Sequence, residues 1–318
     1  MINLSARRRW SDLGRISLPD ETTAQRLERD DAIAAWLSFA VRRWRTSATI
    51  STGVERQWYR QNIVDRPQFR LRDPDDTQTN LFASFSVANT QLPPYSISRE
   101  DGFTFAIVAE RSFEDESTAL RDSTGVHDEN YTEWRSVAAL YKSVDAGGFA
   151  HHVIALRAGG YLSTGSGAAL QRIGGSSGSY AEVLGFGVTG GSRLLPVRGF
   201  DSNVIAGTRA WSATAEWRAP IAMIGRRPSF SPFFIDRVSA NAFLDAGDAW
   251  CSAEEREISQ YCRSIEAIAA PIIGTGAEFA IDFGFAGIFT GRGRVGFGVP
   301  LRGPQDGVRP YLVIGSSF

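Results

Sequence analysis

The sequence predicts an all-β fold, an antiparallel transmembrane β-barrel of about eleven or twelve strands. Three observations lead to this prediction. Apolar and polar residues alternate with a period of two, and this pattern recurs to the end of the chain. No stretch approaches the roughly 18 consecutive apolar residues that a membrane-spanning helix needs. The connections between strand candidates also alternate between short and long for much of the chain.

The alternation is clearest in the C-terminal half. In the segment 211–218, Trp211 and Trp217 fall on one face, and Glu216 and Arg218 on the other. Residues 277–283 repeat the scheme, and so do 238–245 and 295–301. If the apolar face meets lipid, it forms a belt that includes Trp211, Trp217, Phe279, Phe297 and Leu312. A soluble β-sandwich would show the same alternation with its apolar face inside, so the pattern alone leaves both architectures open.

Connection lengths favour the barrel. The strand candidates lie near 33–44, 46–58, 79–90, 102–113, 131–144, 149–162, 206–219, 237–249, 272–283, 291–301 and 309–318, with a weak one near 2–15. Short turns on one side and long loops on the other are typical of bacterial barrels, although the 90–101 and 220–236 connections are long for the short side. With the weak first strand the count is twelve, which places both termini on the periplasmic side. Tryptophans at strand ends suit an interfacial girdle, with core packing as the alternative: Trp44, Trp58, Trp134 and Trp250.

Composition excludes some partners and suggests one covalent link. The net charge of −1 gives no reason to expect nucleic acid. The two cysteines, Cys251 and Cys262, lie in a polar stretch and suit one loop-closing disulfide in an oxidising compartment. Two unrelated free thiols are the alternative. The N-terminal residues show no secretory signal, so we expect either that the true start lies elsewhere or that the chain is the later part of a longer polypeptide.

No motif for catalysis or cofactor binding is convincing. Residues 185–190 and 291–296 fit GxGxxG, but neither lies between a strand and a helix. Residues 174–178 fit GxSxG, yet every histidine precedes Ser176, against the order of that hydrolase fold. Adjacent His151 and His152 would point to opposite faces of a strand and cannot chelate one metal together. We therefore predict no catalytic residue, no metal and no cofactor.

Three stretches resemble the barrel of the BamA/TamA-like bacterial surface antigen superfamily, which includes two-partner secretion transporters. They are the tetrapeptide Val197-Arg198-Gly199-Phe200, the segment FLDAGDAW at 243–250 with its D-x-G pattern, and the run from 215 to the C-terminal Phe318. The resemblance covers roughly residues 150–318 by motif and 30–150 by strand pattern. It implies that residues 1–318 form the C-terminal part of a sixteen-stranded outer-membrane barrel whose periplasmic domains lie upstream.

In that family the tetrapeptide lies on a loop that folds back into the lumen. An arginine entering a confined lumen needs an anionic partner, and a guanidinium suits a carboxylate well. Asp245 shares its face with Ser239 and Asn241, so it is the first candidate for Arg198. The alternates are Glu216, Glu278 and Asp282. Gly199 would let the loop turn sharply, and Gly247 would let it approach the wall.

The C-terminal strand resembles the signal by which outer-membrane proteins are recognised for insertion. Leu312, Ile314 and Phe318 share a face, and Ser316 interrupts the pattern. The resemblance implies contact with outer-membrane lipid and lipopolysaccharide, and with client polypeptides that are inserted or translocated without enzymatic chemistry. The alternative is a passive barrel anchor or pore for an upstream enzymatic or binding domain. Upstream POTRA repeats would favour the first function, and a hydrolase or propeller domain the second.

Overall fold

The computed structural model describes residues 1–17, 23–63, 75–114, 121–122, 125–126, 130–165, 167–176, 182–183, 186–187, 195–226, 233–258, 262, 271–285 and 289–314. Its main feature is one antiparallel sheet of twelve strands, each hydrogen-bonded to the next along the chain. The strands are β1 (Ile2–Ser17), β2 (Thr23–Arg42), β3 (Ser47–Ile63), β4 (Asp75–Gln91), β5 (Glu100–Glu114), β8 (Tyr131–Val144), β9 (His152–Gly165), β14 (Arg209–Arg226), β15 (Phe233–Trp250), β16 (Ile272–Phe285), β17 (Phe289–Arg302) and β18 (Arg309–Ile314).

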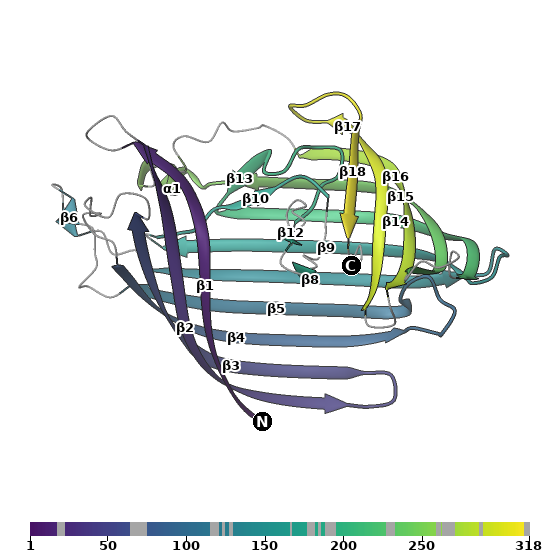
Figure 1. Ribbon diagram of the computed structural model, residues 1–318, viewed down its shortest axis with the longest axis horizontal. Helices are drawn as coiled ribbons and strands as arrows, with labels where there is room; N and C mark the ends of the chain where they lie inside the picture. Colours follow the sequence, from purple (N-terminus) through teal and green to yellow (C-terminus); the bar gives the residue numbers. More distant parts are fainter. Residues whose placement is uncertain are drawn as a thin grey trace.

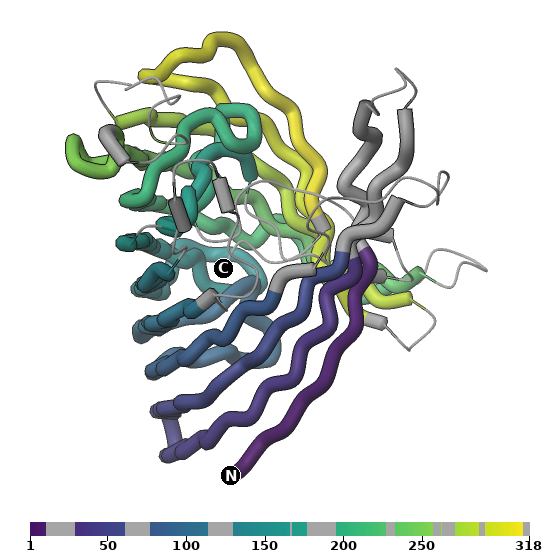
Figure 2. Tube along the Cα trace, turned by 90° about the vertical axis from the view of Figure 1, so that its left-hand side faces the viewer, coloured from purple at the N-terminus to yellow at the C-terminus, as the bar shows by residue number. Residues whose placement is uncertain are grey.

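Short elements occupy the long connections. They are β6 (Arg121–Asp122), β7 (Gly125–Val126), β10 (Gln171–Ile173), β11 (Glu182–Val183), β12 (Phe186–Gly187), β13 (Ile205–Gly207) and the helix α1 (Ala253–Ile258). β10 pairs with β13, and both lie on the inner side of the curved sheet (Figures 1 and 2). Among the described residues, no helix is long and apolar enough to span a membrane.

The sheet curls without closing. Figure 1 shows β1 and β18 crossing the front of the molecule as the two ends of the sheet, and no pairing joins them within the described residues. The register of β17 with β18 extends only from Gly293 to Gly298 on β17. The prediction of an antiparallel barrel-type sheet is confirmed, and the weak first candidate is the strand β1, which gives twelve strands.

The polar face of the sheet is the buried one. On β14, Ser212, Thr214, Glu216 and Arg218 are all buried, whereas Trp217 is 54% exposed. The predicted belt follows the same rule, since Phe279, Phe297 and Leu312 are exposed and Trp211 is partly so. A soluble sandwich would bury the apolar face instead. The orientation therefore excludes that alternative and matches a sheet with an apolar outside and a polar lumen.

Two details differ from the sequence predictions. Several strands continue further toward the long connections than predicted, and β2 begins at Thr23 rather than near residue 33. The segment 23–32 is rich in charges and carries little apolar alternation, so the pattern missed it. The connection predicted at 220–236 shortens to 227–232, because β14 and β15 both extend. That change removes one of the two irregularities in the predicted short–long alternation.

Candidate functional site

The candidate site is a buried charge cluster on the inner face of β14–β18, which we call the lumen cluster. It contains three arginines and three carboxylates: Arg198, Arg218, Arg294, Glu216, Asp245 and Glu278. Arg198 is 2% exposed and Asp245 fully buried. Period-two parity puts the strand residues inside, and the loop before β14 brings Arg198 to them.

Arg198 binds Asp245 through both its side chain and its backbone. Its Nε and Nη2 donate to Oδ2 at 2.7 Å and to Oδ1 at 2.8 Å, the bidentate geometry of a guanidinium–carboxylate pair. The Arg198 backbone N–H donates to the same Oδ2 at 2.9 Å. The guanidinium carbon also lies 3.6 Å from the ring centroid of Phe243, within cation–π range. One carboxylate therefore holds both the side chain and the main chain of the loop.

Of the three alternate partners predicted for Arg198, two lie beside it and the third does not. Glu216 lies 2.8 Å from Arg198 Nη1, and Glu278 lies 3.7 Å from it, so both belong to the cluster. Asp282 does not contact Arg198. Its carboxylate instead pairs with Arg292 on β17, nearer the short-connection end.

Two further arginines belong to the cluster, and the sequence analysis did not select them. Arg218 contacts Glu216 at 2.7 Å from β14, and Arg294 contacts Glu278 at 3.2 Å from β17. Asn241 and the Tyr311 hydroxyl each donate to Glu278 at 2.8 Å. The alternation in the sequence places these residues on the inward face. Which inward residues contact one another depends on the curvature of the sheet.

Glycines form the seat of the loop. A Cβ at Gly274 on β16 would lie 1.9 Å from the Arg198 carbonyl oxygen, and one at Gly298 on β17 would lie 2.4 Å from the Gly199 nitrogen. Gly247 on β15 leaves room for Val197 in the same way. Gly199 has a φ of +95°, which favours glycine. The loop backbone therefore lies directly on β16 and β17 where these strands lack side chains, and the Val197 side chain lies against β15 at Gly247.

Apolar packing holds the rest of the tetrapeptide. Val197 and Phe200 are buried in a cluster with Tyr161, Ile173, Leu195, Ile205, Ala210 and Ile272. Ile173 and Ile205 belong to β10 and β13, so this two-stranded sheet packs against the tetrapeptide. The motif is fixed by ion pairs on one residue and by apolar burial on its neighbours.

A second segment crosses the lumen near the short connections, and no sequence signal pointed to it. The turn between β4 and β5 contains Ile97, which is buried. Arg292 Nη2 donates to the Ile97 carbonyl at 2.6 Å, and Arg237 Nη1 donates to the Ser96 carbonyl at 2.5 Å. Strands β15 and β17 are thereby joined to a turn of the N-terminal half of the sheet.

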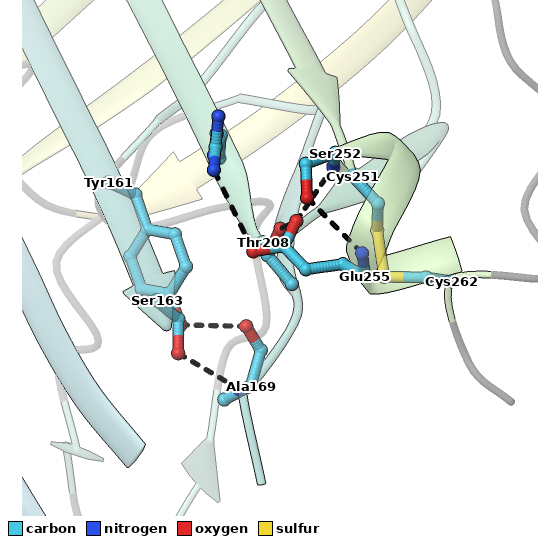
Figure 3. The surroundings of a disulfide bond; sticks show 9 residues. Tyr161, Ser163, Ala169, Thr208, Cys251, Ser252, Glu255 and Cys262 are labelled. Carbon is cyan, nitrogen blue, oxygen red and sulfur yellow. Dashed lines mark hydrogen bonds and ion pairs between the residues drawn. A yellow bond between two sulfur atoms is a disulfide. The ribbon is translucent and has the colours of Figure 1, made fainter. Parts of the chain in front are cut away.

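The disulfide closes a loop at the long-connection end of β15 (Figure 3). Cys251 and Cys262 are joined with a Cα–Cα distance of 5.9 Å. Between them, Ser252 and Glu255 form a reciprocal capping box for α1, a signal present in the sequence as S-x-x-E. Burial opposes ionisation of Glu255, but hydrogen bonds from Thr208 and Ser252 outweigh it and lower its pKa.

The remaining predicted residues are exposed or lie outside the described part. Leu312 on β18 is 70% exposed on the apolar face. Phe318 lies outside the described residues, and the structure describes the backbone of Ile314 but not its side chain. Trp44, Trp134 and Trp250 are exposed at strand ends, and Trp58 is partly buried. Among the described residues, no group of histidine, cysteine or acidic side chains could hold a metal ion.

Comparison with solved structures places the fold. CdiB from Escherichia coli superposes with a TM-score of 0.56 at 15% identity, covering 98% of this chain and 49% of CdiB. BamA from Haemophilus ducreyi lacking POTRA domains 1–3 gives 0.54 at 12% identity, covering 99% of this chain and 59% of that one. The chain has the barrel fold of CdiB and BamA. It spans about half the length of CdiB and less than two thirds of the BamA chain. No protein-family model and no curated protein matches the sequence.

Proposed function

We propose that the chain is an outer-membrane β-barrel of the BamA/TamA-like superfamily that assists insertion or translocation of polypeptides. The proposal covers residues 1–318 as one barrel domain and places it in the bacterial outer membrane. It is supported by the exposed apolar face, the polar lumen and the fold shared with CdiB and BamA. The proposed action is non-enzymatic and needs no cofactor.

The proposal rests on a contrast within the described residues. Ion pairs and the Arg198 loop hold β14–β18 together, whereas the two end strands of the sheet each pair on one side only. The lumen cluster and the Arg198 loop tie β14 to β18 together. At the other end, the 16-residue strand β1 pairs only with β2 in the described residues, through 14 residue pairs. A strand edge presents N–H and C=O groups that can pair with an added extended segment. A client strand would bind there, while the wall keeps its shape.

Under this proposal the Arg198 loop acts as an internal brace. Its contacts reach β14, β15 and β16 through three carboxylates and β17 through Gly298. Removing the brace would let the wall change curvature and would alter the position of β18 relative to β1. The brace also fills part of the lumen, which favours this function over a wide passive pore.

The proposal is tested by reconstituting the chain in vesicles and adding an unfolded outer-membrane polypeptide. The chain should accelerate insertion of the client relative to empty vesicles. Insertion is measured as the change in gel mobility of the unheated client. A photo-crosslinking residue at Leu4 on β1 should capture the client. The matched control is the same residue at Leu156 on β9, which is also apolar and exposed but lies mid-sheet. Equal capture at both sites, without acceleration, would contradict the proposal and support a passive anchor.

A further inference from the structure

A group of arginines lies on the outward face of β1–β3, where an apolar surface would be expected. Alternation along β2 places Arg29 and Asp31 on the same face as the exposed Ile33 and Leu37. In the pairing register, Arg8 lies opposite Asp31, and Arg29 lies opposite Arg60 on β3. These charges therefore belong to the outer face of the sheet and not to the lumen.

The arginines line a hollow of about 740 Å³, which we call the arginine hollow. Its walls include Arg8, Arg29, Asp31, Trp58, Arg60 and Thr77. Asp31 organises two of the guanidiniums: Arg8 Nε donates to Oδ1 at 2.5 Å, and Arg29 Nε lies 2.9 Å from Oδ2. A single carboxylate thus holds two cations side by side, and Arg60 adds a third cation to the same hollow.

Aromatic rings accompany the arginines. Arg29 lies 5.9 Å from the ring centroid of Trp10, and Arg56 lies 6.0 Å from that of Trp58. Further round the same face, Arg111 on β5 lies 5.4 Å from the ring of Phe113. Tryptophan and arginine together are typical of the membrane–water interface, where a ring meets the acyl boundary and a cation meets the headgroups.

The position of the arginine hollow along the strands indicates which class of ligand it meets. An arginine on the lipid face costs about 2–4 kcal/mol near the bilayer midplane but about 0–1 kcal/mol near the interface. On β1–β3 the exposed apolar residues Leu4, Leu37 and Val54 lie between the short-connection ends of the strands and the hollow. The hollow therefore borders the apolar face on the side of the 18–22 and 64–74 connections. In bacterial barrels the side with the longer connections faces the outside. A concave cationic site at that level faces the headgroups of the outer leaflet. Guanidinium groups bind phosphate oxygens through paired charge-assisted hydrogen bonds.

We propose that the arginine hollow binds the phosphate groups of lipid A, the membrane-anchored part of lipopolysaccharide. Arg8, Arg29 and Arg60 contact phosphate oxygens, and Trp58 packs against the sugar or the first acyl carbons. This inference rests on the proposed outer-membrane location and adds a defined lipid site to it. Lipid bound there would cover the outer face of β1 and β2, beside the strand edge at which a client is proposed to pair.

The test is native mass spectrometry of the detergent-folded chain titrated with purified bis-phosphorylated lipid A. The triple variant R8Q/R29Q/R60Q should bind lipid A at least about tenfold more weakly than the parent chain. The matched control is R42Q/R43Q/K142Q, which removes three exposed cations near the short connections. The control should bind like the parent. Dephosphorylated lipid A should bind the parent as weakly as the phosphorylated form binds the triple variant.

A second variant separates loss of folding from loss of the site. R8K/R29K/R60K keeps the charge, and it should retain part of the affinity with a steeper dependence on salt. Equal lipid A binding by the triple variant and the control would overturn the proposal. Equal binding of phosphatidylglycerol and lipid A by the parent would also overturn it. Client insertion in lipopolysaccharide-free vesicles is measured on the parent chain alone, so failure of the lipid site and failure of the proposed function give different results.

Discussion

The two halves of the sheet use arginine in opposite ways. In the C-terminal half, Arg218 on β14 and Arg294 on β17 point inward, are buried and contact carboxylates of the same wall. On β1–β3 a group of arginines points outward beside tryptophan, in the hollow held by Asp31. The residue type is the same, and only its parity along the strand differs. Inward arginines are neutralised within the protein and fix its shape, whereas outward arginines present charge to the surroundings.

Among the inward-facing ion pairs, the substitution with the largest expected effect is Asp245→Ala. The substitution leaves the Arg198 guanidinium buried without its bidentate partner, which costs about 3–5 kcal/mol for a buried pair. Urea unfolding of the folded chain in detergent measures the loss. The matched control is Asp248→Ala on the same strand but the outward face, which should change stability by less than about 0.5 kcal/mol.

A double-mutant cycle tests whether the two partners act together. Arg198→Ala and Asp245→Ala should be non-additive, with a coupling of about 1–3 kcal/mol, because either substitution already breaks the contact. A coupling near zero would contradict the brace.

Whether the outward apolar face meets lipid can be tested by introducing an arginine on it. Phe297→Arg introduces a charge on the exposed apolar face of β17 and should destabilise the vesicle-inserted chain by about 2–4 kcal/mol if the site is near the midplane. Leu301→Arg lies on the same face near the end of the strand, where the cost falls to about 0–1 kcal/mol. Similar losses at both positions would argue against a bilayer around this face.

The glycines beneath the Arg198 loop allow a more specific test with a smaller expected loss of stability. Gly274→Ala would put a methyl group 1.9 Å from the Arg198 carbonyl oxygen, so the loop must shift, at a cost of about 1–3 kcal/mol. Gly293→Ala on β17 is the control, because its nearest neighbour there is a ring carbon of Phe283 at 3.7 Å. If both variants unfold alike, the glycines matter for strand conformation rather than for seating the loop.

The disulfide should have the smallest effect on the whole sheet. Closing so short a loop stabilises by at most about 2–3 kcal/mol, and the gain is local to residues 251–262. Reduction should speed protease cleavage in that loop while the urea midpoint of the sheet stays nearly constant. Thiol titration of the unreduced, folded chain should find no free cysteine, and two reactive thiols would contradict the bond.

The sequence was informative wherever a property depends on parity along one strand. The strands and the face that Asp245 shares with Ser239 and Asn241 follow from a period of two. Which face is buried does not follow from it, because a soluble sandwich shows the same alternation. Parity also placed Glu216 and Glu278 among the candidate partners of Arg198, and both lie beside it. The contact of Arg292 with Ile97 and the arginine hollow depend on how distant strands curve toward one another. Alternation carries no information about curvature, so these contacts could not be predicted. The capping box at Ser252 was visible as a local pattern but gained meaning only beside the disulfide.

The glycine seat also bears on how the sheet assembles. Gly247, Gly274 and Gly298 come from three separate strands, and they meet under the loop only when β15, β16 and β17 are paired in the native register. A slip of one residue in any strand would turn its lumen face outward and put a side chain where the loop backbone must lie. The loop can therefore dock only on a correctly aligned wall. Its buried ion pairs are therefore available only to the native alignment, which they favour over every shifted one.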